Sequence, residues 1–155
     1  MKVVLAICIA CFAATSIAAE IPGASTPGVV NTAVTQANIK KTICVSGWTK
    51  TIRPPATYTT ALKKQQMKAM KLTGTAKDYE EDHRVPLEVG GHPRDPKNLW
   101  PQPWVSQYGA RDKDQLENSV HRAVCGGAMT LKQGQAIFLA PDWRRQFDQF
   151  FKKGT

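Results

Sequence analysis

The chain has 155 residues, of which 42% are hydrophobic, and its formal net charge is +9. This length leaves room for one ordinary domain, and the apolar fraction is typical of a soluble globular chain rather than a disordered one. The positive charge suits a polyanionic partner such as nucleic acid, anionic lipid or acidic polysaccharide, although it could also serve solubility alone.

The first 19 residues have the pattern of a secretory signal peptide. Lys2 gives a positive start, residues 3–14 are apolar, and residues 16–19 are mostly small. The apolar run is too short for a stable membrane span, so we expect cleavage, export to the periplasm or the medium, and no membrane association afterwards. A retained N-terminal anchor is the alternative. A lipoprotein is disfavoured because Cys8 and Cys11 come too early.

Cleavage would leave 20 basic and 12 acidic residues and only two cysteines, Cys44 and Cys125. A pair of cysteines in an oxidising compartment is most simply one disulfide. It would close a loop of about 80 residues, which the chain-entropy account values at roughly 4 kcal/mol. A zinc site built on the two thiolates is the alternative, but Cys44 and Cys125 are far apart in the sequence and do not have the Cys-x-x-Cys spacing.

Residues 20–40 are rich in Pro, Gly, Ser, Thr and Ala and predict a flexible leader, with residues 41–155 forming the domain. Residues 39–52 predict a short strand or extended segment held by the disulfide, ended by the prolines after Arg53. Residues 58–72 predict a helix with a basic face that either contacts phosphates or is simply solvated. That face carries Lys63, Lys64, Lys68 and Lys71.

Residues 79–89 predict a first strand, a Gly-Gly turn follows, and residues 98–104 predict a second strand that its prolines confine to an edge. Residues 110–125 form the clearest helix pattern, and shorter helices are expected over 130–139 and 142–151. The predicted fold is therefore α+β, with a hairpin followed by a helix at its centre and further helices on either side.

The span from residue 78 to residue 100 combines carboxylates, an Asp82-His83 pair, a Gly-Gly turn and Asn98. Hydrolysis of a phosphodiester needs a base and a divalent cation held rigidly together, and histidine is the natural base near neutral pH. Successive side chains of a strand point to opposite faces, so Asp82 can face a metal while His83 faces the substrate. Glu80 would lie on the same side as Asp82 and support it from behind.

The motif resembles that of the HNH, or His-Me finger (ββα-metal), endonucleases. It reads Glu80-x-Asp82-His83-x-x-Pro86-Leu87-x-x-Gly90-Gly91, then Asn98-Leu99, then a helix. The resemblance implies that His83 is the general base, that Asp82 binds one divalent metal, and that Asn98 braces the loop bearing the base. The wider pattern is also similar to small exported bacterial proteins grouped as HNH-like. It runs from Cys-Val-x-Gly-Trp-Thr to Asp-Trp near the C-terminus.

In that superfamily the helix supplies the remaining metal ligands. Glu117 and His121 are four residues apart on the predicted helix and share one face, so we assign both to the metal, with Asp114 in reserve. Mg²⁺ or Mn²⁺ is the expected ion, and Zn²⁺ or Ni²⁺ is compatible. Donor atoms of Asp82, Glu117 and His121 should then lie within about 5 Å of one another.

Basic residues near the motif are candidates for holding the flanking phosphates, among them Arg84, Arg111 and Lys113. The sequence thus predicts an exported, monomeric, single-metal endonuclease acting on DNA, RNA or both. Two other functions stay open. One is a basic nucleic-acid-binding module that keeps the hairpin without catalysis, and the other is a metal-dependent hydrolase of another phosphate or of a cell-wall substrate.

Overall fold

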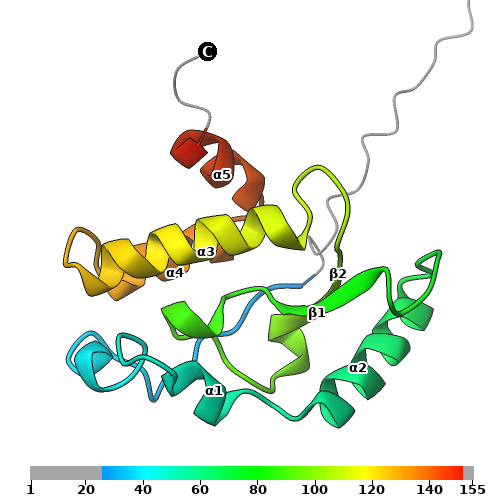
Figure 1. The fold of residues 1–155 in the computed structure, drawn as a ribbon, viewed down its shortest axis with the longest axis horizontal. Helices are drawn as coiled ribbons and strands as arrows, with labels where there is room; N and C mark the ends of the chain where they lie inside the picture. The colour runs from blue at the N-terminus through cyan, green and yellow to red at the C-terminus, as the bar shows by residue number, and fades with distance from the viewer. Residues whose placement is uncertain (1–25, 152–155) are drawn as a thin grey trace, which may run out of the picture.

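The computed structural model describes residues 26–151 as an α+β fold, a two-stranded hairpin followed by helices (Figure 1). The predicted signal peptide and the beginning of the predicted leader lie outside these residues. Within the described part of the chain, no helix is both long enough and apolar enough to cross a membrane.

The hairpin consists of β1 (Tyr79–His83) and β2 (Leu99–Pro103), which pair antiparallel with His83 opposite Leu99. As predicted, β2 tolerates its prolines because each strand of a two-stranded sheet is an edge. The first strand is shorter than predicted. It ends at His83, and the next residues turn into the short 3-10 helix η2 (Leu87–Val89), followed by the 3-10 helix η3 (Pro96–Asn98) before β2.

Helices lie on both sides of the hairpin. The helix α2 (Ala56–Ala69) packs against both strands, and α3 (Ala110–Cys125) lies on the opposite side and contacts η2 (Figure 1). The bounds of α3 match the predicted helix. Its buried stripe, which includes Leu116, Val120 and Val124, faces the main hydrophobic core.

The disulfide Cys44–Cys125 is present, as predicted, and joins residues 81 positions apart. It ties the C-terminal end of α3 to the segment after the 3-10 helix η1 (Ile39–Lys41). The expected strand or extended segment over residues 39–52 is wrong. The segment folds instead as η1, a series of turns and the short helix α1 (Trp48–Ile52), because no neighbouring strand pairs with it in the described structure.

Residues 26–40 differ from the predicted flexible leader. Val34 and Ile39 are buried in the main core, and Val30 forms an isolated antiparallel bridge with Gly91. The apolar residues are too widely spaced to predict a helix or strand, but tertiary packing fixes them. This part of the chain therefore belongs to the domain.

Two helices complete the fold beside α3. The helix α4 (Leu131–Leu139) begins at Thr130 with a capping box to Gln133, as the Thr-x-x-Gln spacing favours. The helix α5 (Trp143–Phe151) follows Asp142, whose carboxylate accepts a hydrogen bond from the Arg144 amide. Trp143 and Phe147 are buried, whereas Phe150 and Phe151 are exposed.

Candidate active site

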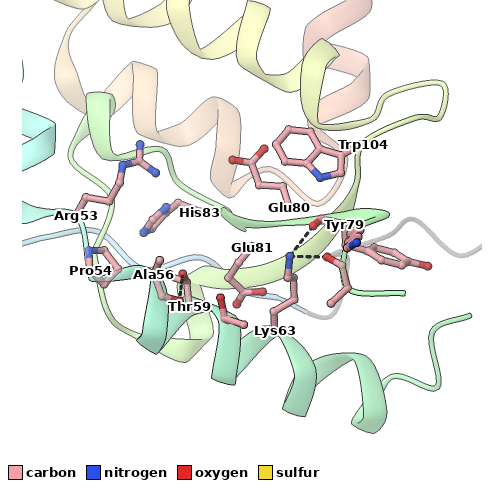
Figure 2. A pocket seen from close by; sticks show the side chains of 13 residues that line it. Arg53, Pro54, Ala56, Thr59, Lys63, Tyr79, Glu80, Glu81, His83 and Trp104 are labelled. Atoms are coloured by element: carbon pink, nitrogen blue, oxygen red, sulfur yellow. Dashed lines mark hydrogen bonds between the residues drawn. The ribbon is translucent and has the colours of Figure 1, made fainter. Parts of the chain in front are cut away.

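A cleft of about 580 Å³ lies between α2, the segment before it and β1 (Figure 2). Successive side chains of β1 point to opposite sides of the strand. Glu81 projects toward α2, whereas Glu80 projects to the other side of the strand, together with Trp104. The cleft is lined by Arg53, Pro54, Ala56, Thr59, Thr60, Lys63, Ala76, Lys77, Tyr79, Glu80, Glu81, His83 and Trp104.

His83 lies at one end of this cleft, beside Arg53 (Figure 2). Its Nε2 atom lies 3.0 Å from the carbonyl oxygen of Pro93. A carbonyl only accepts, so Nε2 carries the proton and the lone pair of the neutral ring is on Nδ1. Burial lowers the pKa of His83 to about 4, against the smaller opposing effects of the Pro93 carbonyl and Asp82. The ring is therefore neutral at pH 7 and able to accept a proton.

Asn98 is fully buried and holds together the backbone around His83. Its Oδ1 atom accepts hydrogen bonds from the amides of Val85 and Val29, and its Nδ2 atom donates to the carbonyls of Val85 and His92. All four bonds reach loop or turn backbone that lacks strand partners. Asn98 thus fixes the loop between β1 and β2, which is the position in which the resemblance placed a brace.

Asp82 faces α3, on the other side of the strand from His83. Its Oδ2 atom lies 2.7 Å from the Nζ atom of Lys113, which also forms an ion pair with Glu117 and donates to the carbonyl of His83. Lys113 is 1% exposed. Burial alone would lower its pKa, but Asp82 and Glu117 outweigh burial and raise it, so the ammonium stays charged.

Further carboxylates surround this ion pair. Burial raises the pKa of Glu80 to about 7, with Asp82 and Asp114 adding to the shift. Burial also raises the pKa of Asp114, and Asp82 contributes. Glu117 and Asp114 line a second, smaller cavity of about 200 Å³ together with Glu88, and Arg53 lines both cavities. One lysine thus sits among several carboxylates that repel one another.

These carboxylates partly fit a divalent metal. Asp82 and Glu117 already share one buried cation, the Lys113 ammonium, and their oxygen donors suit Mg²⁺ or Mn²⁺. The fit is incomplete because Lys113 lies between the two carboxylates. A metal ion would have to displace the ammonium or bind beside it, toward Asp114.

The structure does not bring His121 to this group. Its Nε2 atom lies 2.9 Å from the carbonyl oxygen of Ile43, and its Nδ1 atom lies 3.9 Å from Glu88. Over residues 26–151, the only set of three potential ligands within 4.8 Å of one another is Cys44, His121 and Cys125. The predicted convergence of Asp82, Glu117 and His121 is therefore wrong. Glu117 faces Asp82 through Lys113, but four residues further on, His121 faces the disulfide.

The basic residues predicted to hold phosphates are also distributed differently. Arg84 is buried and donates to the carbonyl of Ala140, Lys113 is enclosed by carboxylates, and Arg111 is exposed at the start of α3 outside the cleft. The cleft instead presents Arg53 and Lys77, with Lys63 donating to the carbonyls of Ala76 and Tyr79.

Three charged cleft residues were missed in the sequence, namely Arg53, Lys77 and Glu81. Arg53 precedes two prolines, which predicted only the end of a regular element, and no spacing rule relates it to His83. Glu81 sits between two predicted functional residues, and only the strand alternation hinted that it would share a face with His83. Burial raises its pKa to about 8, and both carboxylate oxygens are buried and accept no hydrogen bond from the described residues.

The arrangement therefore offers a neutral histidine with an oriented lone pair, nearby cations in an open cleft, and a cluster of carboxylates behind the same strand. In comparisons with known proteins, no family model, no curated protein and no solved structure matches this chain.

Proposed function

We propose that this protein is an exported, metal-dependent endonuclease of the HNH type that hydrolyses phosphodiester bonds of DNA, RNA or both. The observation that carries the proposal is the orientation of His83. Its Nε2 atom is tied to the Pro93 carbonyl, which leaves the lone pair on Nδ1. The cleft beside it is lined by Arg53, Lys63 and Lys77, which suits a phosphate backbone.

In the proposed reaction, His83 Nδ1 takes a proton from a water molecule as the water attacks phosphorus. The bond between phosphorus and the leaving oxygen breaks, and that oxygen takes up a proton from solvent. The Pro93 carbonyl keeps the ring in the reactive tautomer, and Asn98 holds the loop that bears this carbonyl, through His92. Arg53 lies beside His83 and binds the phosphate under attack (Figure 2). A base held in one orientation avoids the entropy loss of positioning it during the reaction.

Asp82 and Glu117 would hold the divalent ion, with Asp114 beside them. When bound, the ion stabilises the negative charge that develops on the phosphate and the leaving oxygen. The excess of carboxylates over cations around Lys113 supports this assignment. Neighbouring carboxylates raise the pKa values of one another, and a bound cation would relieve this repulsion. His121 is not part of the proposed site.

Trp104 gives the cleft a partly exposed aromatic ring at the end of β2, where a nucleobase can stack. Stacking tolerates any base, in keeping with a nuclease of low sequence preference. The disulfide supports the proposed export, because such bonds persist in oxidising compartments.

The test is a plasmid-nicking assay with the purified mature protein. We expect nicking with Mg²⁺ or Mn²⁺ and none with EDTA. His83→Ala should lower the rate by about 10²- to 10⁴-fold, the usual contribution of a general base. His121→Gln serves as the matched control, because this histidine lies outside the cleft, and it should keep the wild-type rate. Nicking by His83→Ala at the wild-type rate would remove His83 as the base.

One observation favours a second candidate, a nucleic-acid-binding module without catalysis. Lys113 already neutralises part of the charge of Asp82 and Glu117, so the fold does not need a metal to compensate them. This candidate predicts salt-sensitive DNA binding that EDTA and Asp82→Ala leave unchanged, and no nicking with any divalent ion.

A further inference from the structure

The disulfide lies against a histidine. Cys44, Cys125 and His121 each offer a ligand atom within 4.8 Å of the others. The three come from the turn after η1 and from the last turns of α3, and none of them lines the His83 cleft. With the sulfurs bonded to each other, this cluster has no thiolate to offer a metal.

We propose that Cys44, Cys125 and His121 form a zinc-type metal site whenever the two cysteines are thiols. The chain holds them as thiols before the disulfide forms, and a dithiol or phosphine reductant regenerates them. Reduction transfers two electrons and two protons to the disulfide, giving two thiols and the oxidised reductant. Metal binding then releases the thiol protons, because the thiolate is the ligand.

The surroundings of His121 favour metal binding by one particular ring nitrogen. Its Nε2 atom donates to the Ile43 carbonyl at 2.9 Å, so the lone pair of the neutral ring is on Nδ1. A hydrogen bond from the second ring nitrogen to a backbone carbonyl is the usual support of a metal-bound histidine, since it fixes the orientation of the ring. This support is present before any metal arrives.

The site also has a candidate fourth ligand and an entry path. The Oε2 atom of Glu88 lies 3.9 Å from Nδ1 of His121, and its Oε1 atom is buried without a hydrogen bond from the described residues. A cavity of about 400 Å³ adjoins the cluster and is lined by Cys44, Glu88, Asn118 and His121 among others. Either Glu88 or a water molecule from this cavity can complete a tetrahedron.

The ligand chemistry selects the ion. Two thiolates and an imidazole are soft and borderline donors that favour Zn²⁺ over Mg²⁺. Thiolates on a tetrahedral zinc lie about 3.8 Å apart, which follows from Zn–S bonds of about 2.3 Å. Cysteines whose Cα atoms are 5.5 Å apart can reach this separation by side-chain rotation. Disulfide formation and metal binding therefore exclude each other, and a bound metal would delay oxidation.

The experiment is a Co²⁺ titration of the full mature protein, reduced with a phosphine and kept without oxygen. We expect a thiolate-to-cobalt charge-transfer band that saturates at one ion per chain, that Zn²⁺ abolishes, and that the oxidised protein lacks. His121→Gln should weaken Co²⁺ binding at least about tenfold. His92→Gln, a histidine outside the cluster, should leave the affinity unchanged.

A second titration in urea separates a built site from cysteines that bind metal in an unfolded chain. We expect the folded, reduced protein to bind Co²⁺ at least about tenfold more tightly than the unfolded one. Equal affinity in urea, equal affinity of His121→Gln, or absence of the band would each overturn the proposal. None of these readouts depends on nuclease activity.

Discussion

At His83, burial and one hydrogen bond determine both the charge and the tautomer of the ring. The nitrogen that faces the Pro93 carbonyl must donate, and burial keeps the ring neutral. The neighbouring Asp82 is almost as buried, but its carboxylate faces the other side of the strand and lies 2.7 Å from the Lys113 ammonium. Two adjacent residues of one strand thus have different partners because they face different sides of it.

The lowered pKa of His83 gives a pH prediction. The acid limb of kcat/KM should fall near pH 4 rather than near the ordinary histidine value of about 6.5, because the base becomes protonated only there. The proposed measurement is plasmid nicking from pH 3.5 to 8, with the His83 ring titrated separately by NMR. A limb near pH 6.5 that matches the NMR titration would contradict the proposed environment of the ring.

The same shift affects stability. Between about pH 4 and 6.5 the unfolded chain binds a proton at this histidine and the folded chain does not, so folding stability rises with pH across this window. The contribution of His83 is present above pH 6.5 and is lost as the pH falls toward 4. His83→Gln should flatten this part of a stability–pH curve relative to the wild-type protein.

At the scale of elements, Lys113 joins α3 to β1. Its side chain crosses from the helix to the carboxylate of Asp82 and the carbonyl of His83, and it also binds Glu117 one turn along α3. The counterion of Asp82 in β1 therefore comes from a lysine of α3. No pattern in the sequence predicted that this lysine would be buried. Its four-carbon stem lets a helix residue fill an apolar gap while its ammonium reaches buried acids.

Lys113→Met should lower the free energy of unfolding by about 3–5 kcal/mol, because it removes the buried cation that forms ion pairs with Asp82 and Glu117. If these carboxylates bind a divalent ion, Mg²⁺ or Mn²⁺ should recover part of the loss and raise Tm more in Lys113→Met than in the wild-type protein. Thermal unfolding with and without the ion measures both effects.

The matched control is Lys132→Met, on the exposed surface of α4, which should change stability by less than about 0.5 kcal/mol. Equal Tm shifts for the wild-type protein and Lys113→Met on adding the ion would argue against metal binding at Asp82 and Glu117.

At the scale of the whole molecule, the disulfide connects the end of α3 to the N-terminal segment that covers the core. Cys44→Ala with Cys125→Ala should lower the free energy of unfolding by roughly 4 kcal/mol, since the 81-residue loop is no longer closed in the unfolded chain. Urea unfolding of this variant and of the oxidised protein measures the difference.

The variant should still nick DNA at temperatures at which it is folded, because neither cysteine lines the His83 cleft. Loss of nicking by a variant that circular dichroism shows to be folded would mean that the disulfide also shapes the site.

The local features follow from the amino-acid sequence. Helical periodicity and capping residues predicted α3 and α4, and the alternation of a strand put Asp82 and His83 on opposite faces. The count of two cysteines after the apolar start predicted the disulfide. The helices and the strand alternation depend on residues close together in the sequence. The disulfide depends on two cysteines that have no other cysteine to pair with after cleavage. Both kinds of information can be read from one sequence.

Which distant groups meet depends on how the elements pack. His121 and Glu117 are one turn apart on the same face of α3, but different segments pack against these two turns. Glu117 therefore contacts Lys113, whereas His121 lies beside the disulfide. For the same reason, Arg53 lies in the cleft, and Val34 and Ile39 of the predicted leader lie in the core. Periodicity predicts which residues of a helix or strand share a face. The tertiary contacts of each residue on that face depend on how the other elements pack.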